Sequence, residues 1–271
     1  MMIDYSNVKH LIHKELLEVK SDKGTYIPLL MIPIMFAVVF PLAIFMLGVN
    51  NSATQLITGL NAFIEHVDTH MFPADLNKDS VVIYAIYMYF FAPLFLMIPV
   101  IFSTLIASSS FIGEKEKKTI EGLLYTPLTI KELMMGKLLA AALPSIIITW
   151  IAIVVYGIIV NIYSFKFMDQ LIFPNLNWIV LTFLLIPLIT FLTISLVIAV
   201  SHRTKTSKSA QSYSMIIVLP ILSFVISQST GLMVFGLQMI LILVVVLIVL
   251  NVCMFIFITR TFNTDKFLTK L

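Results

Sequence analysis

The sequence contains few charged residues. Only 11% of its 271 residues are Asp, Glu, Lys or Arg, whereas 60% are hydrophobic and the mean hydropathy is +1.05. Soluble domains carry about 25% charged residues. This composition excludes a soluble protein and indicates an integral membrane protein. Cysteine is also scarce, since Cys253 is the only one; this excludes a disulfide framework or a cysteine-based metal site within one chain.

Charge is absent altogether from the six longest apolar segments. A helix needs about 20 apolar residues to cross the hydrocarbon core of a bilayer. The segments cover residues 26–48, 81–109, 138–160, 178–200, 213–227 and 232–259. We therefore predict an all-α polytopic membrane protein with six transmembrane helices. Ionisable groups inside a membrane are typical of proton relays and ion-coupled carriers, so their absence argues against a secondary carrier and against an intramembrane enzyme.

Positive charge is distributed unevenly between the two sides of the predicted membrane domain. Of the 17 Lys and Arg residues, only Lys78 and Lys166 fall on one side. The remaining fifteen fall on the other, in the terminal segments and alternate loops. Cytoplasmic loops carry the excess of Lys and Arg. We therefore expect a multi-pass protein of the cell (plasma) membrane with both termini in the cytoplasm.

The N-terminal segment has the pattern of an amphipathic helix. Between residues 4 and 20, apolar residues recur at helical spacing: Val8, Leu11, Ile12, Leu16 and Val19. Charged residues lie largely on the other faces: Lys9, Lys14, Glu15, Glu18 and Lys20. This pattern predicts a helix within residues 1–24 that lies in the membrane interface, followed by a six-span domain over residues 25–271. A plain membrane anchor without a partner is the alternative.

The densest charge cluster lies between the second and third apolar segments. Residues 114–125 predict a short helix, because Glu114 and Lys118, and likewise Lys117 and Glu121, stand four residues apart. Pro127 ends this helix. Residues 129–132 then have the pattern of a capping box, which starts a new helix leading directly into the third segment. A short helix joined in this way to a membrane-crossing helix is suited to transmit movement; a solvated loop is the alternative.

The motifs of this loop resemble those of ABC transporter type-2 permeases. The matching residues are Glu114-Lys-Glu116, Thr119-Ile-Glu121, Leu123-Leu124, Pro127 and Gly136-Lys137-Leu138. Lys118 departs from the pattern, because the family often has Gly there. The resemblance implies the membrane subunit of a bacterial ATP-driven exporter, with residues 114–125 as its coupling helix and residues 4–20 as its connecting helix.

The resemblance also implies partners and site residues. Separate cytoplasmic ATPase subunits would bind ATP and Mg²⁺, and this chain, which has no G-x-x-x-x-G-K-[ST] motif, would not be an enzyme. The implied ATPase-coupling residues are Glu114, Glu116, Lys117, Thr119, Glu121, Tyr125 and Pro127. The implied connecting-helix residues are Lys9, Leu11, Lys14 and Glu15. A second copy or a paralogue would pack through the second and fifth spans, and no nucleic acid partner is expected.

The second apolar segment is rich in aromatic residues. Under the family resemblance, some of them would line a cavity or a dimer face: Tyr84, Tyr87, Phe91, Phe95 and Phe102. An uncharged aromatic wall is suited to an amphipathic or hydrophobic cargo such as a peptide, a lipid or a drug, and antimicrobial peptide export or resistance is one such role. The alternative is that these rings pack against lipid or neighbouring helices.

The long loop after the first segment predicts a second interfacial helix, on the outer side. His66 and His70 stand four residues apart within it, but two histidines on an exposed helix are more often solvated than metal-bound, and we expect no metal site. Two other classes of function remain open: a non-transport membrane immunity or assembly protein, and a permease for ATP-driven extrusion of an ion such as sodium.

Overall fold

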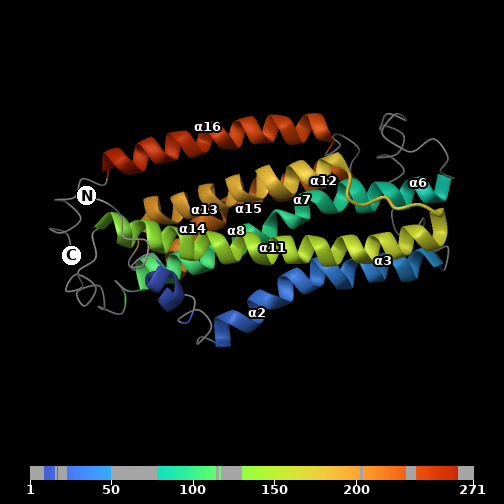
Figure 1. The fold of residues 1–271 in the computed structure, drawn as a ribbon. Coiled ribbons are helices and arrows are strands. Elements are labelled where there is room, and N and C mark those ends of the chain that lie inside the picture. The colour runs from blue at the N-terminus through green and yellow to red at the C-terminus, as the bar shows by residue number, and fades with distance from the viewer. Residues whose placement is uncertain are drawn as a thin grey trace.

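The computed structural model describes residues 9–15, 17, 23–49, 78–113, 116, 130–201, 204, 206–229 and 236–261. Throughout these residues the regular elements are helices, and six helical stretches are long and apolar enough to cross a membrane (Figure 1). We number them spans 1 to 6: Leu29–Met46, Ile83–Gly113, Glu132–Lys166, Leu176–Ser201, Ser207–Gln228 and Leu237–Ile258. The predicted all-α fold with six membrane-crossing helices is confirmed.

Most spans combine several helical segments. Span 1 comprises α2 (Lys23–Ile34), the π-helical η1 (Met35–Val39) and α3 (Phe40–Val49). Span 2 comprises α6 (Lys78–Ala85), the π-helical η3 (Ile86–Phe90), α7 (Phe91–Phe95), α8 (Met97–Ser108) and the π-helical η4 (Ser109–Gly113). Span 4 comprises α12 (Leu176–Val180), the π-helical η5 (Leu181–Leu185) and α13 (Ile186–Ser201). Span 5 comprises α14 (Ser207–Ser214), the 3₁₀-helical η6 (Met215–Ile217) and α15 (Val218–Ser229).

Spans 3 and 6 are each a single helix, α11 (Ile130–Met168) and α16 (Leu237–Thr261). The long helices run alongside one another, and α11 extends over the full length of the bundle (Figure 1). The starts of α2, α11 and α14 lie at one end, which we call the Lys137 end (Figure 1). The end of α3 and the start of α6 lie at the opposite end, which we call the Lys166 end.

The span boundaries differ from the predicted ones by between one and six residues, and two helix starts are informative. Span 5 begins at Ser207, six residues before the predicted start, because Thr206 caps α14 by accepting a hydrogen bond from the Ser209 backbone N–H at 3.2 Å. Hydropathy alone gave the later start, since this first turn is rich in serine. The helix of span 3 begins at Ile130 and continues without a break into the apolar segment, which confirms the predicted direct connection.

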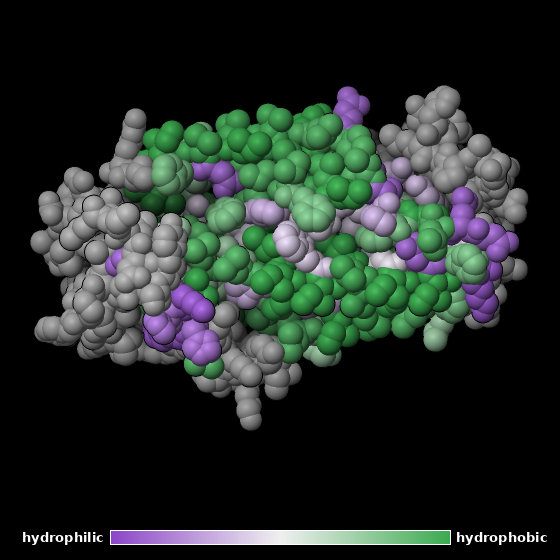
Figure 2. All heavy atoms as spheres, viewed as in Figure 1, coloured by the Kyte–Doolittle hydropathy of each residue, from purple (hydrophilic) through white to green (hydrophobic). Residues whose placement is uncertain are grey.

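The surface of the bundle is that of a membrane protein. Hydrophobic side chains cover most of the helices on the face shown in Figure 2, and hydrophilic ones gather mainly at the two ends. Span 6 is the most exposed, with large apolar side chains such as Val245 and Phe255 facing outward. It is attached to span 4, where the Asn251 side-chain amide donates to the Leu188 carbonyl at 3.0 Å. Such a belt is suited to lipid contact.

Candidate functional site

A buried ion pair joins the N-terminal helix to span 3 at the Lys137 end. Residues 9–15 are helical, and Glu15 Oε1 lies 3.8 Å from Lys137 Nζ of α11. The two side chains are only 3% and 5% exposed. Lys14, which is about half exposed, also contacts Glu15 Oε1, at 3.3 Å. An ion pair removed from water is held strongly only when other polar groups also satisfy it.

Span 2 supplies a further partner for the same lysine. Lys137 Nζ donates a hydrogen bond to the Ser110 carbonyl in η4 and lies 5.7 Å from the centre of the Phe111 ring. Carbonyls near a helix end lack partners within their own helix, so a lysine is a suitable donor there. One ammonium group therefore connects three elements: the N-terminal helix, the end of span 2 and the start of span 3.

The residue before this lysine explains how the two helices approach so closely. A Cβ atom built at Gly136 would lie 2.6 Å from Leu11 Cδ2 and 3.3 Å from Leu11 Cβ, so any larger residue would force the leucine to shift. Leu11 is 5% exposed. Leu11 and Glu15 are four residues apart and share a helix face, which places them on the adjacent pair Gly136 and Lys137.

We expect Gly136→Ala to displace the N-terminal helix and to destabilise its docking by about 1–3 kcal/mol, the range for overpacking. The rate of tryptic cleavage after Lys9 and Lys14 would measure this, because both bonds become accessible when the helix detaches. Adding Leu11→Ala should restore the slow rate. Gly113→Ala is a matched control, since a Cβ there would be 3.4 Å from its nearest neighbour, Ser207 Oγ. Equal cleavage in Gly136→Ala and the parent protein would contradict the proposed fit.

The loop between spans 2 and 3 contacts span 5 through Glu116. This carboxylate is exposed, and its Oε2 accepts a hydrogen bond from the Ser207 backbone N–H at 2.9 Å. Ser207 is the first residue of α14, where free N–H groups and the helix dipole favour a negative charge. Glu116 and Thr206 thus satisfy separate donors of the same helix end.

The remaining predicted coupling residues lie outside the described residues: Glu114, Lys117, Thr119, Glu121, Tyr125 and Pro127. Among the predicted connecting-helix residues, Lys9 is exposed on the N-terminal helix, whereas Leu11, Lys14 and Glu15 take part in the contacts above. His66 and His70 are also outside the described part. Within the described ranges, no group of three or more His, Cys, Asp or Glu side chains could hold a metal ion.

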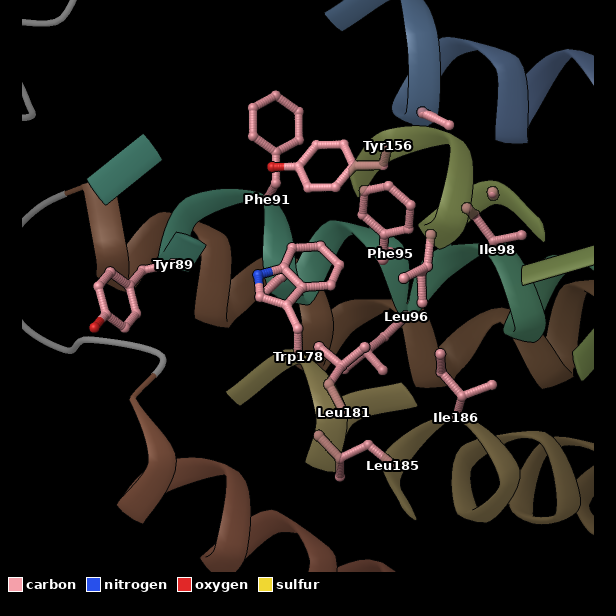
Figure 3. Close-up of a cluster of buried hydrophobic side chains, with 14 of the residues drawn as sticks. Tyr89, Phe91, Phe95, Leu96, Ile98, Tyr156, Trp178, Leu181, Leu185 and Ile186 are labelled. Carbon is pink, nitrogen blue, oxygen red and sulfur yellow. The ribbon is translucent and has the colours of Figure 1, made fainter. Parts of the chain in front are cut away.

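The aromatic residues predicted for a cavity or dimer face are packed against other residues of the chain. All five are buried, with exposed fractions of 7% or less: Tyr84, Tyr87, Phe91, Phe95 and Phe102. The Phe95 ring contacts the rings of Tyr156 and Trp178 at centroid distances of 4.9 and 5.2 Å (Figure 3). These rings therefore belong to the buried cluster that joins spans 2, 3 and 4, and their place at a cavity or dimer face of the assembled transporter stays a prediction. The aromatic pattern of span 2 did not distinguish these possibilities.

The contacts of Lys137 could not be predicted from the sequence. There, Lys137 is one of the fifteen basic residues of the predicted cytoplasmic side and part of the motif Gly136-Lys137-Leu138. The sequence feature that relates to this contact is the pair Leu11 and Glu15 on one helix face. Leu11 is large where Gly136 is small, and Glu15 is opposite in charge to Lys137. A pattern match between segments so far apart in sequence is visible only after the contact is known.

The fold and these contacts define an all-α membrane protein of six spans. The sequence model of the ABC-2 family transporter protein family matches residues 10–233. The chain therefore belongs to this family, as its loop motifs indicated, and is an ABC-2 type membrane protein of the ABC transporters. Members of this family are typically membrane subunits without an ATPase site of their own. Comparison with curated proteins and with solved structures finds no significant match.

Proposed function

We propose that this chain is the permease subunit of an ABC exporter, in which separate cytoplasmic ATPase subunits hydrolyse ATP and this subunit moves cargo outward. The observation that carries the proposal, beyond family membership, is the junction at Lys137. That lysine joins the N-terminal helix, span 2 and span 3 through Glu15 and the Ser110 carbonyl. Glu116 adds a connection to span 5.

This junction is suited to mechanical coupling. A force on the N-terminal helix reaches span 3 through a buried ion pair, and a force on the loop after span 2 reaches span 5 through Glu116. Because α11 is one continuous helix of 39 residues, movement at its start is transmitted along the membrane-crossing part. Packed helices that shift as rigid bodies are a common form of switching transition.

Each end of the bundle then lies on a defined side of the membrane and meets defined partners. The Lys137 end faces the cytoplasm, where the excess of Lys and Arg lies, and the ATPase subunits bind there against residues 4–20 and 114–125. ATP and Mg²⁺ belong to those subunits. A second copy of this chain or a paralogue completes the transporter. The cargo is amphipathic or hydrophobic, such as a peptide, a lipid or a drug, because the apolar segments offer no charged group to recognise an ion or a sugar phosphate.

The test is reconstitution of the chain with the ATPase subunit that co-purifies with it. We expect no ATP hydrolysis by the chain alone, hydrolysis by the complex, and stimulation by amphipathic peptides added to the vesicles. Replacing Glu116 and Glu121 together by Ala should abolish the stimulation while basal hydrolysis persists. Ser212→Ala, an exposed position on α14, serves as the control.

Unchanged peptide stimulation in the double variant would refute the coupling role of this loop. A partner that binds without any ATP-dependent flux would instead favour an immunity or assembly protein. Stimulation by sodium ions in place of peptides would favour ion extrusion.

A further inference from the structure

The outward face of the N-terminal helix carries only basic ionisable groups. Its inward face is the one that docks, with Leu11 against Gly136 and Glu15 beside Lys137. Glu15 is the only acidic residue between positions 9 and 17, and it is 3% exposed. Four-residue spacing brings the other ionisable side chains together in pairs on the exposed side. These are Lys9 with His13, and His10 with Lys14.

The acidic groups described near this helix leave its positive charge largely uncompensated. Lys14 contacts Glu15 Oε1 at 3.3 Å, yet 47% of its side chain remains exposed. Glu132, near the start of α11, is only 4% exposed. Glu116 is exposed, but its carboxylate accepts the hydrogen bond from the Ser207 backbone N–H. Among the described residues of the Lys137 end, the outward face of this helix is therefore a concentration of positive charge.

The contacts of the helix also determine its depth. Leu11 and Glu15 lie against the two residues that precede Leu138, where the third apolar segment begins. Figure 1 shows the helix as a short dark blue element at the Lys137 end. It therefore lies at the edge of the apolar belt. In a bilayer this is the level of the headgroups, just outside the hydrocarbon core.

One apolar side chain stands among these basic groups. Leu17 is 53% exposed and follows His13 by one turn on the same face. On the neighbouring α11, Met135 is also 39% exposed. Helices that lie in a membrane interface combine basic residues with apolar ones, because headgroup phosphates attract the former and the acyl boundary buries the latter. This combination favours a lipid surface over the surface of a soluble protein.

We infer that the outward face of the docked N-terminal helix is a binding surface for anionic phospholipid headgroups. The two lysines supply ammonium groups to the phosphates, the two histidines supply ring N–H donors, and Leu17 reaches the acyl boundary. In the orientation proposed above, this end meets the cytoplasmic leaflet, whose surface is negatively charged. The inference goes beyond the proposed function, because lipid binding needs neither ATPase nor cargo. Within residues 4–20 it assigns this face to lipid rather than to the ATPase subunits.

In the first test, the full chain is reconstituted into vesicles of equal amounts of phosphatidylcholine and phosphatidylglycerol, extracted in mild detergent and measured by native mass spectrometry. We expect the lipids that stay bound to be enriched in phosphatidylglycerol. Replacing Lys9 and Lys14 together by Gln should lower the bound ratio of anionic to neutral lipid by about fivefold or more, since even one basic residue near an anionic surface has an effect of this size. Lys208→Gln is the matched control. Lys208 is exposed on α14 beside the contact of Glu116 with Ser207, so its charge is offset locally and the ratio should not change.

The second test keeps every charge and moves only the helix. Gly136→Ala should displace the N-terminal helix, whose outward face is then no longer held at the headgroup level. We expect the phosphatidylglycerol enrichment to fall as tryptic cleavage after Lys9 and Lys14 becomes faster. Adding Leu11→Ala makes room for the new methyl group and should restore both the slow cleavage and the enrichment.

Three results would overturn the inference: an unchanged lipid ratio in the lysine double variant, an equal loss in Lys208→Gln, or full enrichment in Gly136→Ala while cleavage shows the helix detached. If the double variant keeps its lipid ratio but loses the co-purifying ATPase, the face belongs to the ATPase, and the inference fails while the proposed function stands. If the enrichment behaves as expected and no ATPase assembles with the chain, the proposed function fails while the lipid surface stands.

Discussion

Lys137→Met is expected to destabilise the chain by about 3–5 kcal/mol, the range for removing one partner of a buried ion pair. The substitution removes a buried cation from the Glu15 carboxylate, which is 3% exposed, and leaves the half-exposed Lys14 beside it. It also leaves the Ser110 carbonyl without its lysine donor. The free energy of unfolding in detergent, measured by denaturant titration, would test this, and the complex should lose peptide-stimulated ATP hydrolysis as well.

The matched variants for this prediction come from the same cluster. The double variant Glu15→Gln, Lys137→Met should recover much of the lost stability, because it removes both buried charges together. Lys14→Met should change stability by less than about 1 kcal/mol, since its ion pair is half exposed. A double variant as unstable as Lys137→Met alone would show that the ion pair does not explain the effect.

Trp178→Ala is expected to destabilise the chain by about 3–5 kcal/mol, the range for removing a large aromatic side chain from a packed core. Trp178 is 1% exposed. Its ring lies 5.0 Å from the Tyr156 ring and 5.2 Å from the rings of Phe95 and Phe173. The substitution therefore leaves a cavity where spans 2, 3 and 4 meet, and it removes the donor to the Met88 carbonyl.

The neighbouring residue provides the control for this position. Ile179 follows Trp178 in α12 but is 43% exposed on the outer surface, so Ile179→Ala should change stability by no more than about 0.5 kcal/mol. Thermal unfolding followed by circular dichroism would compare the two variants. Similar losses in both would mean that the aromatic cluster does not hold these spans together.

Much of the fold could be predicted from the sequence because membrane helices are determined by local composition. An apolar run of sufficient length must form a helix in a bilayer, since no water is present to bond its backbone. This rule gave all six spans. It failed at the start of span 5, where Thr206 accepts a hydrogen bond from the Ser209 backbone N–H and Ser212 Oγ donates to the Lys208 carbonyl. Hydropathy does not register such caps.

The candidate site was predictable only in part. The residue types of the loop motif indicated the family, and the resemblance drew attention to Glu116 as a coupling residue and to Glu15 on the connecting helix. The span 2 aromatics were not resolved by sequence, because a ring-rich helix has the same pattern whether it lines a cavity or fills a core. The burial of Phe95 and its contact with Trp178 depend on how spans 2, 3 and 4 pack.

The sequence by itself determined the class of protein, the number of spans, the helix that enters span 3 and the family, because composition, periodicity and short motifs are properties of contiguous residues. Only the tertiary structure decided that Lys137 meets Glu15, and that Trp178 and Gln228 bond carbonyls of span 2. Each of these contacts joins segments that are distant in sequence. A buried charge or carbonyl requires a nearby polar group because the interior has low polarity. Which polar group meets it depends on how the helices pack, and the sequence alone does not determine that packing.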